Sequence, residues 1–82
     1  MISKKIKDFI LLNFSNSEVF VKTSDEIHFE IIVINDFFIN VNLIDRHRYI
    51  YSVINYFIVN KILHAVSLQT HTTDEWKKIL KK

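Results

Sequence analysis

The feature that most constrains this chain is the complete absence of glycine and proline from its 82 residues. Glycine normally occupies backbone positions with positive φ because it has no Cβ atom, and proline normally stiffens turns. We therefore expect every left-handed position to be filled by Asn or Asp, the residues that tolerate this conformation best after glycine. We expect bends at Asn35-Asp36 and at Asn40 to Asn42, where such residues cluster.

The chain is also short and contains no cysteine. Its length suffices for one small domain, so we expect a single domain over residues 1–82. Without cysteine it forms no disulfide, no thiolate metal site and no cysteine nucleophile. Any metal site must use His, Asp or Glu, or ligands that a partner supplies.

Hydropathy and charge argue against a membrane protein and give no strong signal for nucleic acid. The most apolar run, Ile31 to Ile34, is far shorter than the roughly 20 residues that cross a bilayer. The first residues are amphipathic, unlike a signal peptide. We therefore expect a cytoplasmic protein without a membrane partner. A net charge of +2 is ordinary for a soluble domain.

Helical periodicity predicts three helices. Ile2, Ile6, Ile10 and their neighbours recur at helical spacing, which predicts a first helix that ends between residues 13 and 16. A second helix is predicted by the same spacing around Ile50 and Ile54, before Asn60-Lys61. The third helix follows a capping box formed by Thr72 and Glu75. We expect four large aromatic residues to lie in the core: Phe37, Phe38, Phe57 and Trp76.

Three segments read as strands. Residues 18–22 and 27–34 are rich in β-branched residues, and the polar turn of residues 23–26 between them predicts a hairpin. Residues 62–70 form the third predicted strand. The order α-β-β-α-β-α predicts an α+β domain with a three-stranded sheet and helices on one face.

Several motifs occur in an order that resembles the BolA family, most of all its compact YrbA (IbaG) branch. They are His28-Phe29-Glu30, Arg46 to Tyr51, Ile62 to Ser67, and Thr72 to Trp76. The resemblance implies a KH-like (type II) fold and no catalytic activity. It also implies binding to a monothiol glutaredoxin, with a [2Fe-2S] cluster shared with glutathione, in iron–sulfur cluster handling or stress response. We expect a monomer that forms a heterodimer with its partner and holds no cluster when alone.

The chain departs from the family pattern at three places. Asn40 stands where the family has glycine after Phe38-Ile39, so we expect a positive φ at Asn40. Thr73 replaces the proline of the last motif, which leaves the capping box intact. Between the first two strands, where many relatives carry a Cys or His ligand, this chain has Asp25 or a neighbour.

The resemblance assigns metal ligation first to His64. A neutral imidazole is a good ligand for iron. The residues alone leave a second interpretation open, because His64 alternates with Val66 and Leu68 as a strand residue would. His28 is the second candidate ligand, and a local hydrogen bond is its alternative role. For Asp25 we expect a turn of the Asx type, since carboxylates suit iron–sulfur clusters poorly.

A small basic group on the second helix is the remaining candidate site. Arg46, His47 and Arg48 could contact nucleic acid or an acidic partner, and an ordinary solvated helix face is the alternative. A DNA-binding regulator that uses this helix is therefore the second functional hypothesis. The RNA grip of KH domains needs a GXXG loop, which this chain lacks. No pattern of catalytic residues stands out, so we predict no enzymatic activity.

Overall fold

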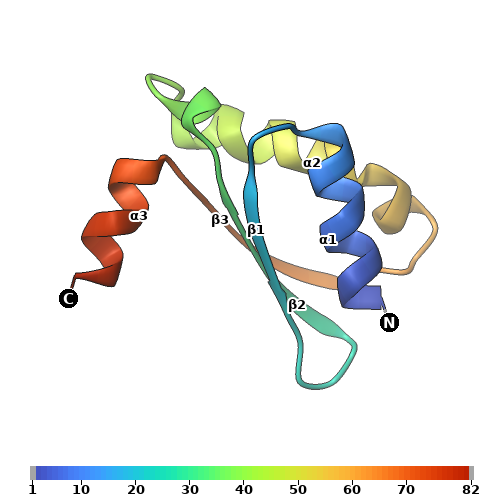
Figure 1. The fold of residues 1–82 in the computed structure, drawn as a ribbon. Helices are drawn as coiled ribbons and strands as arrows, with labels where there is room; N and C mark the ends of the chain where they lie inside the picture. The colour runs from blue at the N-terminus through green and yellow to red at the C-terminus, as the bar shows by residue number, and fades with distance from the viewer. Residues whose placement is uncertain (1, 82) are drawn as a thin grey trace.

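The computed structural model describes residues 2–81, so the terminal Met1 and Lys82 lie outside the described part. Its elements confirm the predicted fold class (Figure 1). They are α1 (Ile2–Asn13), β1 (Glu18–Lys22), β2 (His28–Ile34), the 3₁₀ turn η1 (Asp36–Phe38), α2 (Leu43–Val59), β3 (Ala65–His71) and α3 (Thr73–Leu80).

The three strands form one mixed sheet in the order β1-β2-β3. β1 and β2 are antiparallel, with Glu18 opposite Ile34, which confirms the predicted hairpin. β3 runs parallel to β2, with His28 opposite Ala65, and α2 makes the long connection that a parallel pair requires. β1 and β3 are therefore the two edges of the sheet.

Side chains alternate between the two faces of the sheet, and the inner face carries the core. Its strand residues pack with the apolar stripes of α1 and α2 into one cluster. The least exposed members are Ile6, Ile10, Phe29, Ile31, Val33, Phe38, Ile50 and Ile54. Burying one such side chain stabilises the fold by about 1.5–3 kcal/mol, so this cluster is the main source of stability.

Helix α3 lies against the other, outer face, so the expected placement of helices on one face is corrected for α3. The Trp76 ring lies 5.8 Å from Phe20, whose side chain alternates with the buried Val19. Figure 1 shows α3 across the strands from α1. The physical reason is that the outer face also carries apolar side chains, Ile32 and Ile34, which Trp76 helps to shield.

The aromatic core prediction is confirmed for two residues and wrong for a third. Phe38 and Phe57 are buried, whereas Phe37 is 64% exposed. The two consecutive phenylalanines of η1 point in different directions, and only one reaches the core. Trp76 is half-buried on the outer face.

The third strand begins at Ala65 and not at Ile62 as predicted. The amides of Ile62 and Leu63 both donate to the carbonyl of Phe57, at 2.9 and 3.0 Å, and so finish the end of α2. Lys61 makes this possible with a φ of 58°. Leu63 is buried in the core, which explains why an apolar pair at a helix end resembled the start of a strand.

Within residues 2–81, four residues take the left-handed conformation that glycine usually occupies: Asn16, Glu26, Asn40 and Lys61. Asn40 has a φ of 64°, as predicted. Glu26 and Lys61 show that the expectation of Asn or Asp at every such position was too narrow. Both lie in tight connections, where neighbouring hydrogen bonds fix the backbone regardless of the side chain. Across residues 2–81, every helix is too short or too polar to cross a membrane.

Candidate functional site

The outer face is open where α3 does not reach, and a hollow of about 580 Å³ lies there. We call it the histidine hollow. Its wall combines the β1–β2 connection with the beginning of β3. The lining residues are Lys22, Thr23, Ser24, His28, Phe29, Glu30, Ala65, Val66 and Ser67.

Asp25 organises the β1–β2 connection beside this hollow. Its Oδ1 accepts hydrogen bonds from the amides of Ile27 at 2.9 Å and His28 at 2.8 Å. Thr23 adds a bond from its hydroxyl to the carbonyl of His28 at 2.7 Å. These contacts confirm the predicted Asx-type turn. They hold the pKa of Asp25 well below its usual range, chiefly through the His28 amide and then the His28 ring.

The same carboxylate orients the imidazole of His28. Asp25 Oδ2 lies 2.7 Å from His28 Nδ1, and the His28 side chain is 73% exposed. A carboxylate at Nδ1 favours a proton on that nitrogen, so in the neutral ring the lone pair is on Nε2. His28 therefore presents a nitrogen donor whose direction is fixed by a residue of its own turn.

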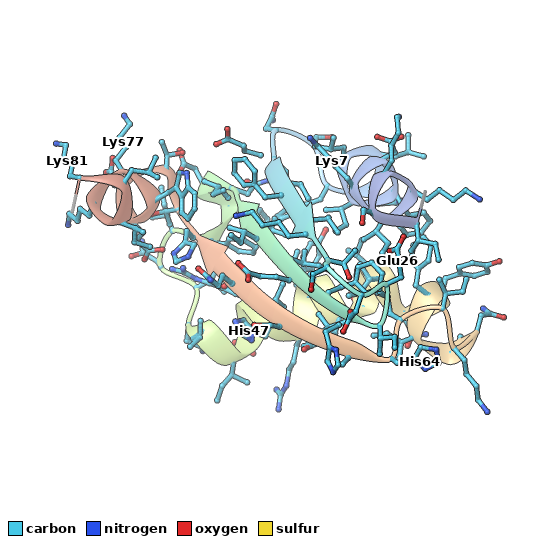
Figure 2. All side chains as sticks on the ribbon, turned by 90° about the horizontal axis from the view of Figure 1, so that it is seen from below. Lys7, Glu26, His47, His64, Lys77 and Lys81 are labelled. Atoms are coloured by element: carbon cyan, nitrogen blue, oxygen red, sulfur yellow. The ribbon has the colours of Figure 1, made fainter. Side chains whose placement is uncertain are left out.

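His64 is exposed and lies at the bend just before β3. The strand interpretation of His64 is therefore corrected, because the amides of residues 62 and 63 bond back to α2 and β3 begins only at Ala65. The register places Ala65 opposite His28, so His64 directly precedes the residue that pairs with His28. Figure 2 shows His64 near the start of β3, far from Lys77 and Lys81 of α3. The two candidate ligands thus lie at the same end of the sheet.

The donor set at this end is incomplete for a resident metal ion. Within the described range 2–81, no group of three or more His, Cys, Asp or Glu residues is arranged to hold a metal. A [2Fe-2S] cluster needs four ligands, of which imidazoles can supply up to two in a mixed site. His28 and His64 would supply at most those two ligands, and the remaining two thiolates would have to come from other molecules.

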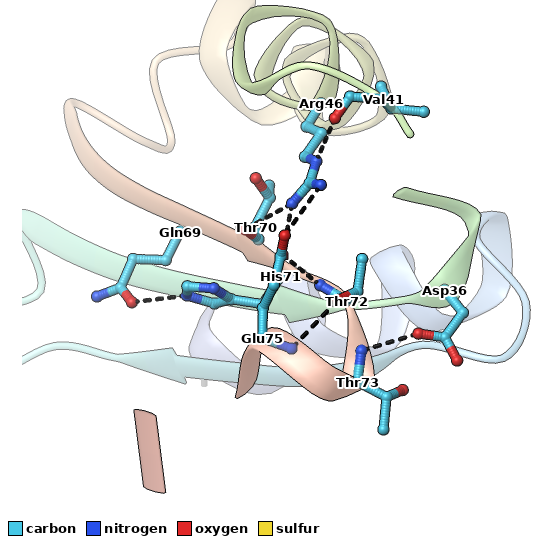
Figure 3. A network of polar contacts seen from close by, with 9 residues as sticks. All are labelled: Asp36, Val41, Arg46, Gln69, Thr70, His71, Thr72, Thr73 and Glu75. Carbon is cyan, nitrogen blue, oxygen red and sulfur yellow. Dashed lines mark hydrogen bonds and ion pairs between the residues drawn. The ribbon is translucent and has the colours of Figure 1, made fainter. Parts of the chain in front are cut away.

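The predicted basic group on α2 is divided by the structure. The Arg46 side chain is only 11% exposed, and its guanidinium donates to Glu75 Oε1 at 2.7 Å and Oε2 at 3.3 Å (Figure 3). Its Nε donates to the carbonyl of Val41 at 2.8 Å. Arg46 therefore joins α2 to α3 and does not belong to an exposed basic group.

Arg48 differs from Arg46 in exposure. The Arg48 side chain is 79% exposed and lies 3.8 Å from Asp45, a loose contact on the surface of α2. His47 is half-buried on the same helix. A binding role for these residues stays a prediction, and Arg48 is the member that presents an accessible charge.

The contact between Arg46 and Glu75 is the feature that sequence reasoning missed. Glu75 also completes the capping box of α3, because its Oε1 accepts from the Thr72 amide at 2.8 Å. Arg46 first, and the Thr72 amide second, lower the pKa of Glu75 from 4.5 to about 2. The capping box predicted Glu75 correctly, but no local signal could pair it with an arginine 29 positions away.

Comparison with known proteins gives a consistent picture. A family model described as BolA-like protein matches residues 8–75. An uncharacterized protein of Buchnera aphidicola subsp. Acyrthosiphon pisum is 36% identical over 81 residues, which cover 99% of this chain and all of that one. The acid stress protein IbaG of Escherichia coli is 26% identical over 76 residues, which cover 93% of this chain and 89% of that protein.

Longer relatives and solved structures match as well. The DNA-binding transcriptional regulator BolA of Escherichia coli is 33% identical over 57 residues, which cover 70% of this chain. The same match covers only about half (53%) of that protein. The structure of a BolA homologue from Coxiella burnetii superposes with a TM-score of 0.79 at 32% identity, covering 92% of this chain and 95% of that one. This chain therefore matches the Buchnera protein and IbaG over most of their length, but the longer BolA regulator over only about half of its length.

Proposed function

Because the chain belongs to the BolA family, we propose that it is a cytoplasmic, non-enzymatic adaptor that binds a monothiol glutaredoxin. In the complex, the two proteins and glutathione would share a [2Fe-2S] cluster, for cluster handling or stress response. The observation that supports this best is the placement of two exposed imidazoles, His28 and His64, at one open end of the sheet. The regulators and the stress protein among its relatives bear names that point to no enzymatic activity.

In this proposal His64 supplies the principal protein ligand. It lies in a bend outside the hydrogen-bonded strand and is exposed, so a partner can approach its ring without unfolding β3. Replacing one thiolate by a neutral imidazole removes negative charge from the cluster, which raises its reduction potential and changes its spectrum. A cluster with a histidine ligand is therefore distinguishable from one held by thiolates alone.

His28 is the second candidate ligand, and Asp25 is its positioning residue. A carboxylate on the far nitrogen of a ligating histidine fixes the ring and makes it a better donor. Asp25 makes that contact at 2.7 Å and is itself held by two amides. Asp25 thus acts through His28 and not as an oxygen ligand.

Co-expression with the monothiol glutaredoxin of the same source tests the proposal. We expect a coloured heterodimer whose visible and electron paramagnetic resonance spectra differ from those of the glutaredoxin homodimer. His64→Ala should abolish this difference, while His47→Ala, a histidine on α2 outside the site, should preserve it. An unchanged spectrum and cluster lifetime in the His64→Ala heterodimer would contradict the assignment of His64.

His28 and Asp25 need a separate comparison. His28→Ala should shorten the cluster lifetime, and Asp25→Asn should have a smaller effect in the same direction because the ring loses its orientation but not its donor. Calorimetry of the proteins without cluster measures binding of the glutaredoxin by itself. If neither calorimetry nor co-purification shows binding, the adaptor role is rejected whatever the histidines do.

DNA binding is the second candidate function, favoured by the exposed Arg48 and by the names of the longer relatives. Arg46 does not contribute to it, because its guanidinium is bonded to Glu75. Titration of duplex DNA at several salt concentrations separates the two functions, since a binder that neutralises several phosphates weakens steeply with salt. Arg48→Ala should then lower the salt slope by about one. Weak binding without sequence preference would leave the adaptor role alone.

A further inference from the structure

A second hollow, of about 640 Å³, lies on the outer face between α3 and β1. We call it the α3 groove. It shares Lys22 with the histidine hollow, so the two occupy neighbouring parts of one face. Its lining comprises Asn16, Ser17, Glu18, Phe20, Lys22, Ile32, Ile34, Thr73, Trp76, Lys77 and Leu80.

The floor and one wall of the α3 groove are apolar. Ile32 and Ile34 form the floor outside the main core, and the rings of Phe20 and Trp76 meet 5.8 Å apart beside them. Leu80, on the last turn of α3, is 65% exposed although it lines the groove. An apolar side chain placed here would cover surface that the domain itself leaves open to water.

The rim of the α3 groove is predominantly positive. Lys22 on β1 and Lys77 on α3 line it, against a single acidic residue, Glu18. Neither lysine makes an ion pair with any residue of the described part of the chain, whereas Lys4 on α1 is paired with Asp8 at 2.7 Å. Two ammonium groups that are free of ion pairs, although Glu30 lies opposite Lys22 on the next strand, stand beside an apolar floor and complement a ligand that carries both carboxylates and apolar groups.

The groove is formed before any ligand arrives. The capping box at Thr72 fixes the first turn of α3, and the ion pair of Glu75 with Arg46 ties that turn to α2. The amide of Thr73 donates to Asp36 at 2.8 Å and adds a third anchor. A site whose walls are already fixed binds with a smaller loss of conformational entropy.

We propose that the α3 groove docks an acidic segment of a partner protein. An apolar side chain of the segment would lie against Phe20, Trp76 and Leu80, and its carboxylates would meet Lys22 and Lys77. A nucleic acid fits less well, because two lysines and an adjacent glutamate neutralise few phosphates and the floor is aliphatic. This inference goes beyond the proposed adaptor function, since it requires neither His64 nor a cluster.

The test uses the full chain and a synthetic capped peptide in which two leucines are flanked by four glutamates. Trp76 is the only tryptophan, so its fluorescence reports the groove directly, and amide chemical shifts in NMR spectra give a second measure. We expect a saturable change in Trp76 emission, with the largest shifts at residues that line the groove. The same peptide with glutamines in place of glutamates should bind at least about tenfold more weakly.

Variants inside the α3 groove are compared with a control variant on α1. Lys77→Glu should weaken the peptide at least about tenfold, and Leu80→Ala should weaken it several-fold without altering the fold, because that side chain is largely exposed. Lys7→Glu makes the same charge change on α1, away from the groove, and should leave the affinity within about twofold (Figure 2).

Three results would overturn the proposal. The first is a wild-type titration without saturable change in either measurement. The second is equal loss of affinity in Lys77→Glu and Lys7→Glu, which would reveal unspecific attraction by net charge. The third is a single-stranded oligonucleotide that competes with the peptide and binds more tightly. No glutaredoxin is present in this experiment, so its outcome is independent of the adaptor function.

Discussion

The two faces of the sheet are built on different principles. The inner face is apolar apart from the buried Thr70, which lies opposite Val33, and it is covered by α1 and α2. The outer face mixes Lys22, His28, Glu30 and Ser67 with a few apolar residues, and α3 covers only one end of it. Stability therefore depends mainly on the inner face, while the groups that can bind a ligand or a partner lie on or beside the outer one.

This division has a physical cause in the size of the domain. With 82 residues, the chain can build one well-packed layer of helices on a sheet but has too little material for a second complete layer. The short α3 contributes Trp76 and leaves the rest of its face to solvent. A small α+β domain thus obtains a binding surface because one face of its sheet stays uncovered.

The largest expected effect comes from a cavity in the inner face. Ile54, on α2, is fully buried, so Ile54→Ala should lower the free energy of unfolding by about 2–5 kcal/mol in a urea titration. The comparable loss on the outer side, Leu80→Ala, should stay within about 0.5 kcal/mol because Leu80 is mostly exposed. Similar losses in both variants would refute the division of roles between the faces.

The inner face was the part of the fold that sequence could predict. Helical spacing in α1 and α2 and β-branched residues in β1 and β2 define two periodic apolar patterns, and both were found where predicted. The periodicity of apolar residues does not identify the secondary structure at Ile62 and Leu63. Two apolar residues in a row suit a strand or a helix end equally, and the backbone bonds to Phe57 decided between them.

The candidate site was predictable as a set of residue types and not as a geometry. Sequence singled out His28, His64 and the Asx turn at Asp25, and the structure brings the first two to one end of the sheet. It could not show that Arg46 is withdrawn from the basic group, because that depends on a contact with Glu75 far along the chain. Nor could it show the α3 groove, which arises from the position of α3 relative to β1.

The next largest effect concerns the attachment of α3 to the rest of the domain. Arg46→Ala should lower the free energy of unfolding by about 1–3 kcal/mol, since it removes two bonds to Glu75 and one each to the carbonyls of Val41 and Thr70. The loss should be measured with Arg48→Ala as the matched arginine control, because the side chain of Arg48 is exposed. An equal and small effect in both would mean that Trp76 and the bond from the Thr73 amide to Asp36 hold α3 without help from Arg46.

The ion pair of Arg46 with Glu75 predicts that the free energy of unfolding falls at acid pH. The pKa of Glu75 is lowered from 4.5 to about 2 in the folded state, so its contribution is complete above pH 4.5 and is lost as the pH falls from about 4.5 to about 2. Glu75→Gln should therefore be less stable than wild type at neutral pH, with the gap narrowing across that interval. A gap that does not change with pH would show that the carboxylate charge of Glu75 does not stabilise the fold.

A smaller effect is expected at the start of α3. Thr72 accepts the amide of Glu75 at 3.2 Å in the capping box, so Thr72→Ala should cost about 1 kcal/mol in a denaturant titration. Thr72→Ser keeps the hydroxyl and should recover most of that loss. If the two variants are equally less stable than wild type, the methyl group of this buried threonine, and not its hydrogen bond, stabilises the fold.

The smallest effect is expected at Asn40, which belongs to neither face. It lies between η1 and α2 with a φ of 64°, and the turn is closed by the Val41 amide bound to the carbonyl of Phe38 at 2.9 Å. Asn40→Gly removes the Cβ cost but adds unfolded-state entropy, so it should be neutral or stabilising by up to about 1 kcal/mol. Asn40→Ala keeps the Cβ without the local polar group and should destabilise. A clear loss of thermal stability in Asn40→Gly would mean that the asparagine side chain, and not its tolerance of positive φ, determines this turn, and the lack of glycine in the chain would then need another explanation there.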